Sequence, residues 1–180
     1  FFMQIIVAKM LIDQGLVIDS FYGIFGIQEL TRMFSQLFTV FVFLVIVNSI
    51  NFIDGVDGLA LTELIKILLI FLFFIEINSS LFFLGIITIG SLIPLYYFNF
   101  RKEHKVFLGD GGSLYLGTLI CIYVFYFLNS NFIFNYPFNK PLISILILLF
   151  PLLDLLRVFI IRISNKKSPF HPDNNHLHHL

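Results

Sequence analysis

The chain has few charged residues and almost no cysteine, and both shortages limit what it can be. Charged residues make up only 12% of its 180 residues and hydrophobic residues 58%, whereas a soluble domain carries about 25% charged residues. This composition excludes an ordinary soluble domain and indicates an integral membrane protein. The formal net charge is zero, so no basic surface predicts nucleic-acid binding. The single cysteine, Cys121, excludes a disulfide within the chain.

Long apolar runs are abundant, and they predict an all-α polytopic membrane protein. A bilayer core about 30 Å thick needs about 20 largely apolar helical residues. Residues 1–11 are typical of a partial N-terminal helix, and residues 13–33 of a polar connection with a small interfacial hairpin around Gly23. Five full membrane-spanning helices are predicted over residues 34–50, 58–76, 81–98, 112–128 and 141–162.

Basic residues are distributed unevenly between the two ends of these predicted spans. Five crossings place the connections at 51–58 and 99–111 on one side, together with residues 163–180. That side carries Arg101, Lys102, Lys105, Arg162, Lys166 and Lys167, whereas the other side carries Arg32 and Lys140. Because cytoplasmic loops carry an excess of Lys and Arg, we expect the first side to face the cytoplasm.

An acidic stretch lies between the first two predicted full spans. It contains Asn51, Asp54 and Asp57, and carboxylates at a membrane boundary are costly enough to indicate a functional site. In a helical turn the two acids would share one face. In an irregular turn, Gly55 and Gly58 would adopt positive φ angles and bring N–H groups around an anion. The alternative is an acidic interhelical turn without a function.

A second acidic position, Asp110, lies among the glycines 109, 111 and 112 just before a helix predicted to begin near Ser113. Glycines allow close backbone approach, and a helix N-terminus offers N–H donors to an anion. Asp110 would then need a cation, and a hard divalent ion such as Mg²⁺ fits a carboxylate next to phosphate oxygens. The alternative is a glycine-rich helix cap with a solvated aspartate.

Three histidines, His176, His178 and His179, lie within four residues near the C-terminus, after Pro169 and Pro172, which exclude a regular helix there. Imidazoles can bind zinc, but structural zinc sites usually include cysteine and catalytic sites space their ligands differently. Histidines can equally donate to phosphate or move protons near neutral pH.

Three motifs in order give the chain a resemblance to a known family. They read Asn51-x-x-Asp54-Gly-x-Asp57-Gly-Leu-Ala, then Phe107-Leu-Gly-Asp110-Gly-Gly-Ser113-x-x-x-Gly117, then Ser168-Pro-Phe-x-Pro-Asp173-x-x-His176-x-His178-His179. Together they strongly resemble the polyprenyl-phosphate N-acetylhexosamine-1-phosphate transferases, of glycosyltransferase family 4. This family includes GlcNAc-1-phosphate transferases of surface-polysaccharide and O-antigen synthesis and the phospho-N-acetylmuramoyl-pentapeptide transferase of peptidoglycan synthesis.

The resemblance implies a Mg²⁺-dependent enzyme, with Mn²⁺ as an alternative ion, in the bacterial inner membrane. Such an enzyme transfers a sugar 1-phosphate from a UDP-N-acetylhexosamine to polyprenyl phosphate and releases UMP. The resemblance leaves open whether the chain forms a homodimer.

Each motif also implies roles for particular residues. Asp54 and Asp57 would be catalytic and Asp110 would bind the metal. Substrate contacts would come from Asn51, Asn99, Phe107, His176, His178 and His179, with Phe107 against uracil, Asn99 at the base edge and the histidines over the diphosphate.

The chain departs from the family pattern because it has no Asp-Asp pair, which members carry on an earlier helix. Residue 1 is Phe, so we expect a sequence truncated before residue 1 and after the histidines. We also predict that the 180-residue piece alone has little transferase activity, which robust UMP release by that piece would contradict.

Three other functions remain as alternatives. The histidine motif favours a GlcNAc-type enzyme over the muramoyl-pentapeptide branch. A non-catalytic paralogue would lack the upstream acidic pair. A proton-coupled transporter would distribute carboxylates such as Asp54, Asp57 and Asp154 through the depth of the membrane.

Overall fold

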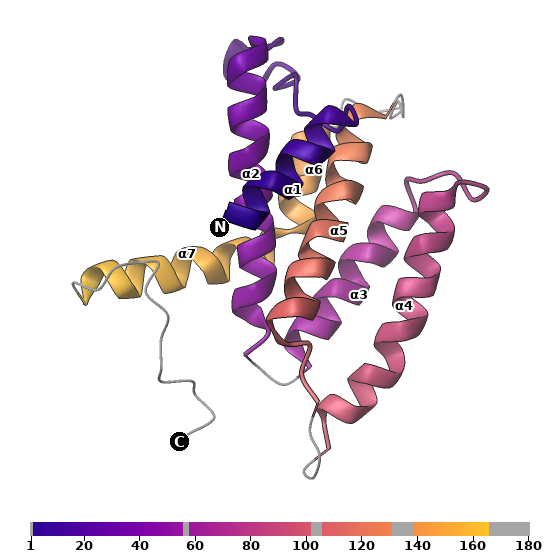
Figure 1. The fold of residues 1–180 in the computed structure, drawn as a ribbon. Coiled ribbons are helices and arrows are strands. Elements are labelled where there is room, and N and C mark those ends of the chain that lie inside the picture. Colours follow the sequence, from indigo (N-terminus) through magenta and orange to yellow (C-terminus); the bar gives the residue numbers. More distant parts are fainter. Residues whose placement is uncertain (1, 56–57, 102–105, 131–138, 166–180) are drawn as a thin grey trace.

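The computed structural model of the chain is built from helices (Figure 1). It describes residues 2–55, 58–101, 106–130 and 139–165. A single turn of 3-10 helix covers Ile24–Gly26. The α-helices are α1 (Phe2–Asp13), α2 (Arg32–Ile53), α3 (Leu59–Leu72), α4 (Ser80–Asn99), α5 (Gly109–Asn129), α6 (Lys140–Ile147) and α7 (Leu149–Ser164). The predicted all-α class is therefore confirmed for the described residues.

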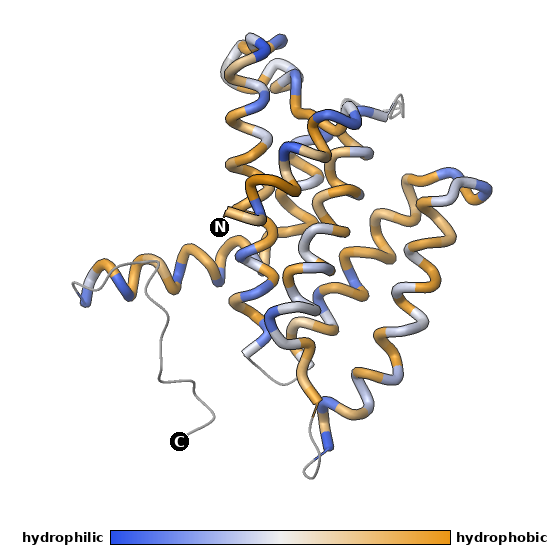
Figure 2. The backbone as a smooth tube through the Cα atoms, in the orientation of Figure 1, coloured by the Kyte–Doolittle hydropathy of each residue, from blue (hydrophilic) through white to orange (hydrophobic). Residues whose placement is uncertain are grey.

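Three of these helices, α2, α4 and α5, are long and apolar enough to cross a membrane. The α6–α7 pair adds a fourth span if its two bent halves count as one. Helix α3 has only 14 residues, which is shorter than the roughly 20 residues that a membrane span needs. The predicted number of five full spans is therefore not confirmed. Figure 2 shows apolar residues along α2, α4 and α5 and hydrophilic ones mainly at the ends of these three helices.

The predicted single helix over residues 141–162 is wrong, because the chain bends by 68° between α6 and α7. Pro151 lies in the first turn of α7 and has no N–H to donate to the carbonyl of Ile147, the last residue of α6. The ring of a proline also clashes with that carbonyl in a straight helix. As a result, α7 leaves the bundle sideways (Figure 1).

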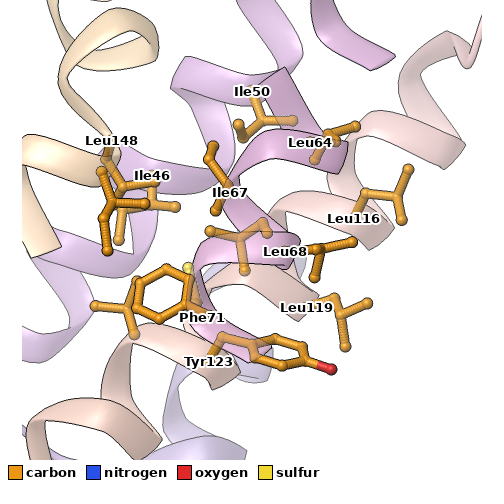
Figure 3. Close-up of a cluster of buried hydrophobic side chains, with 14 of the residues drawn as sticks. Ile46, Ile50, Leu64, Ile67, Leu68, Phe71, Leu116, Leu119, Tyr123 and Leu148 are labelled. Atoms are coloured by element: carbon orange, nitrogen blue, oxygen red, sulfur yellow. The ribbon is translucent and has the colours of Figure 1, made fainter. Parts of the chain in front are cut away.

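The core lies where α2 and α3 pack against α5. Figure 3 shows Ile46 and Ile50 of α2, Ile67 and Phe71 of α3, and Tyr123 of α5 in this cluster. Their side chains are 0–2% exposed. Between membrane helices, such close packing supplies most of the association energy.

A close approach of α2 to α5 sets the position of the residues beyond it. A Cβ atom on Gly117 would lie 3.0 Å from the Cα of Val47, so only glycine fits at this distance without a shift. One helical turn onward, towards the end of α2 and the start of α5, the neighbouring residues are Asn51 and Ser113. The packing at Gly117 therefore brings two of the sequence motifs together.

The connections of the bundle gather at its two ends (Figure 1). The end of α2, the start of α3, the end of α4 and the start of α5 lie at one end, and the end of α3, the start of α4 and the end of α5 lie at the other. Between α1 and α2, Ser20 and Glu29 form an antiparallel bridge. The Ile18 N–H donates to Thr39 Oγ1 at 2.9 Å, which attaches this segment to α2.

Candidate functional site

Asn51 near the end of α2 reaches two residues of the first turns of α5. Its Nδ2 donates to Ser113 Oγ at 2.7 Å and to Asp110 Oδ1 at 3.4 Å. Ser113 is fully buried, whereas Asp110 is exposed. The first two motifs, which are about sixty residues apart in the sequence, therefore meet at one end of the bundle.

Asp54 follows the last residue of α2 and caps the start of α5. Its carboxylate accepts hydrogen bonds from the backbone N–H groups of Leu108 and Gly109. The sequence predicted free N–H donors at this helix start, but Asp54 occupies two of them. Gly109 has a φ of +65°, which glycine adopts without steric cost, and α5 begins there, earlier than the predicted start near Ser113.

The environment of Asp54 disfavours its charged form. Burial raises the pKa of its carboxyl from 3.8 to about 6, the N–H groups of Gly109 and Leu108 lower it in part, and the negative charge of Asp110 raises it. A carboxyl with this pKa exchanges a proton close to neutral pH, as a general base does.

We expect this shift to make the stability of the metal-free protein depend on pH. A folded-state pKa above the unfolded one means that the folded state binds more protons, so stability falls as pH rises from about 4 to about 7. Asp54→Asn removes this titration. The melting temperature of Asp54→Asn minus that of the wild type, measured in EDTA, should therefore increase over this range, and a difference that shrinks with pH would contradict the assignment.

Asn99, the last residue of α4, links the segment before α3 to the segment before α5. Its Oδ1 accepts the N–H of Gly58 at 2.5 Å, and its Nδ2 donates to the carbonyl of Val106 at 2.8 Å. The side chain is 3% exposed. Asn99 therefore holds the start of α3 and the segment before α5 at a fixed separation.

Gly58 adopts a φ of +67°, as expected for one form of the acidic turn, whereas Gly55 does not. A Cβ atom on Gly58 would lie 2.2 Å from Cζ of Phe100. The ring of Phe100 thus packs directly on the backbone of Gly58, next to the hydrogen bond that the Gly58 N–H donates to Asn99.

The remaining predicted site residues are placed only in part. Phe107 is 41% exposed, three residues before Asp110. Asp57, His176, His178 and His179 lie outside the described residues. No role was predicted for Ser113 from the sequence. Ser113 lies three residues after Asp110, however, which places the two residues on one helical face.

The described residues of the site offer oxygen atoms as donors for a metal ion, whereas the three C-terminal histidines lie outside the described part of the chain. Within the described part of the chain, no group of three His, Cys, Asp or Glu side chains could hold a metal ion. Mg²⁺ instead uses one or two carboxylates, completed by water and substrate phosphate. Asp110 is exposed, and among the described residues Asn51 Nδ2 approaches its Oδ1 at 3.4 Å, so its carboxylate could serve as such a ligand.

Comparisons with known proteins find relatives that are named as undecaprenyl-phosphate alpha-N-acetylglucosaminyl 1-phosphate transferases. The chain is 35% identical over 94 residues to the undecaprenyl-phosphate alpha-N-acetylglucosaminyl 1-phosphate transferase of Haemophilus influenzae, and 34% identical over 94 residues to that of Pasteurella multocida. It is 30% identical over 95 residues to that of Escherichia coli K12. These alignments cover about half of the chain, and the chain spans 25% of the length of these relatives.

No solved structure matches the chain. The model of one family, "Glycosyl transferase family 4", matches residues 1–128. This region includes the acidic stretch after α2, the hydrogen-bonded Asn99 at the end of α4 and the start of α5. The chain therefore belongs to glycosyl transferase family 4.

Proposed function

We propose that the full-length protein transfers N-acetylhexosamine 1-phosphate from a UDP-sugar to undecaprenyl phosphate and releases UMP. The observation that carries this proposal is the meeting of the two acidic motifs, where Asn51 bonds to both Ser113 and Asp110 at one end of apolar helices. An amphiphilic acceptor and a water-soluble donor can meet only at such a boundary between membrane and water.

The proposed reaction exchanges one phosphoanhydride bond, in the UDP-sugar, for another, between the lipid phosphate and the sugar phosphate. An oxygen of the lipid phosphate attacks the β-phosphorus of the UDP-sugar, the bond from that phosphorus to the bridging oxygen breaks, and UMP leaves with the bond's electrons. Several negative charges converge in this step, so they must be neutralised by positive groups. Asp110 would hold Mg²⁺, which supplies charge neutralisation at the phosphate oxygens.

The chain's own carboxylates have separate proposed roles. Asp54 and Asp57 are the proposed catalytic groups. In the direct attack one of them acts as a base for the acceptor phosphate; in a two-step route a carboxylate first takes the sugar phosphate as UMP leaves, and the lipid phosphate then displaces that carboxylate. The pKa of about 6 for Asp54 supports a role in proton transfer near neutral pH. Its bonds from Leu108 and Gly109 also tie the catalytic turn to the start of α5.

Substrate contacts are proposed on both sides of Asp110. The exposed ring of Phe107 is suited to stack on uracil, and Asn99 would shape the wall beside it through its bonds to Gly58 and Val106. The Nδ2 of Asn51 would support the metal end of the site. His176, His178 and His179 are proposed to close over the diphosphate.

The orientation of the site is proposed from charge. Basic residues cluster with the site connections, which favours the cytoplasmic side of the bacterial inner membrane. The relatives are named for N-acetylglucosaminyl transfer, which favours UDP-GlcNAc over a muramoyl-pentapeptide donor.

A transporter is less well supported by the described residues. Asp154, the only aspartate expected deep in the membrane, pairs with Arg157 at 2.8 Å on its own helix. Asp54 and Asp110 instead lie together at one end of the bundle, where they cannot form a path across it.

The proposal is tested with purified full-length protein, undecaprenyl phosphate and a panel of UDP-sugars. We expect UMP release that requires both the lipid phosphate and Mg²⁺ and is fastest with UDP-GlcNAc. Release of UDP in place of UMP, or release that is independent of the lipid, would contradict the proposed reaction.

A further inference from the structure

Ser113 is fully buried in the second turn of α5, and its hydroxyl has neighbours on its own helix. Its Oγ lies 3.0 Å from the carbonyl oxygen of Gly109 and 3.2 Å from that of Asp110. A serine hydroxyl has one proton and two lone pairs. The carbonyls of the preceding turn take the proton, so the lone pairs remain for a donor from elsewhere.

That donor is Asn51 of α2. Its Nδ2 lies 2.7 Å from Ser113 Oγ and 3.4 Å from Asp110 Oδ1. The shorter bond fixes the amide group, and the longer one directs a second N–H towards the carboxylate. Because Ser113 is 0% exposed, we expect no solvent water to replace its oxygen if the hydroxyl is removed.

We propose that Ser113 is a positioning residue whose hydroxyl holds Asn51 so that Asn51 orients the Asp110 carboxylate for a divalent cation. Ser113 itself contacts neither the cation nor the substrates. The inference rests on the proposed function, because it assigns the metal to Asp110. Residues that orient a metal ligand in this way typically contribute 10- to 100-fold to metal affinity or activity.

If Ser113 only stabilised its own helix, removing its hydroxyl would not change metal binding. The same helix offers a matched control for this alternative. Thr118 Oγ1 donates to the carbonyl of Leu114 at 2.9 Å, which is the same bond to the fourth preceding residue that Ser113 makes to Gly109. Both hydroxyls therefore contribute similarly to α5, but Ser113 also accepts the cross-helix bond from Asn51.

The test measures Mn²⁺ binding to the purified full-length protein by electron paramagnetic resonance, without substrates. We expect Ser113→Ala to raise the Mn²⁺ dissociation constant by about 10- to 100-fold. Thr118→Ala should change it by less than about twofold. In the Asn51→Ala background, Ser113→Ala should have no further effect, because the two residues act through one contact. Equal Mn²⁺ affinity for wild type and Ser113→Ala would overturn the proposal.

Folding and activity measurements separate the remaining outcomes. Ser113→Ala and Thr118→Ala should melt within a few degrees of each other, and a Ser113→Ala protein that does not fold would show a general structural role and contradict the proposal. The Mg²⁺ concentration for half-maximal UMP release should rise with Ser113→Ala. A wild type that binds Mn²⁺ but releases no UMP would contradict the proposed function and leave the positioning role supported.

Discussion

Asp110→Asn in the full-length protein should reduce Mg²⁺-dependent UMP release by about a thousandfold or more. A metal at a phosphoryl group supplies several kcal/mol of charge stabilisation, and each 1.36 kcal/mol is tenfold in rate. Asparagine keeps the size of Asp110 and can still interact with Asn51, which approaches Oδ1 at 3.4 Å, but it lacks the charge that holds the cation. The measurement is the initial rate of UMP release at saturating UDP-GlcNAc across a series of Mg²⁺ concentrations.

Asp13→Asn is the matched control for this experiment. Asp13 pairs with Lys9 on α1, away from the acidic connections, and its exposed ion pair contributes little to stability. We expect the control to keep the wild-type rate and Mg²⁺ dependence. If Asp110→Asn keeps its turnover and its metal affinity, Asp110 is not the metal ligand.

Asn99→Leu should lower both the melting temperature and the turnover of the full-length protein. The substitution removes the acceptor of the buried Gly58 N–H, and an unpaired buried donor costs about 1–3 kcal/mol. The turn that carries Asp54 and Asp57 then loses its attachment to α4, so we expect turnover to fall by about 10- to 100-fold. Thermal melts and steady-state kinetics measure the two effects.

A second substitution separates positioning from substrate contact. Asn99→Asp keeps an oxygen for the Gly58 N–H but cannot donate to Val106, so its melting temperature should exceed that of Asn99→Leu. Asn129→Leu is the control, because Asn129 is an exposed asparagine whose Nδ2 donates to Gly15 at the other end of the bundle. An Asn99→Leu protein with wild-type stability and only a raised KM for the UDP-sugar would contradict this structural role. It would show that Asn99 contacts the substrate instead.

Local sequence patterns were sufficient to predict the helical class and to single out two acidic motifs, which the structure brings together at Asn51. Long apolar runs determine helices in a membrane because every backbone group must bond within its own segment. Aspartates beside glycines at the ends of such runs are costly enough to indicate a candidate functional site. The same reasoning identified Asn51, Asp54 and Asp110, which the structure brings to one end of the bundle.

The contacts within the site could not be predicted in this way, because they depend on how helices pack. The approach of Gly117 to Val47 determines that Asn51 meets Ser113, and no spacing within either motif encodes that distance. The capping of α5 by Asp54 likewise joins residues more than fifty positions apart. The bend before α7 does have a local signal in Pro151, but a proline in a membrane helix predicts a bend without its angle.

Transfer of the sugar together with its phosphate distinguishes the proposed reaction from transfer of the sugar alone, and a double-label experiment detects the difference. Full-length protein in membranes is given undecaprenyl phosphate and UDP-GlcNAc that carries ³²P in the β-phosphate and ³H in the uridine. We expect ³²P in the lipid fraction and an equal amount of ³H in water-soluble UMP. Recovery of both labels in UDP, with unlabelled sugar on the lipid, would contradict the proposed reaction.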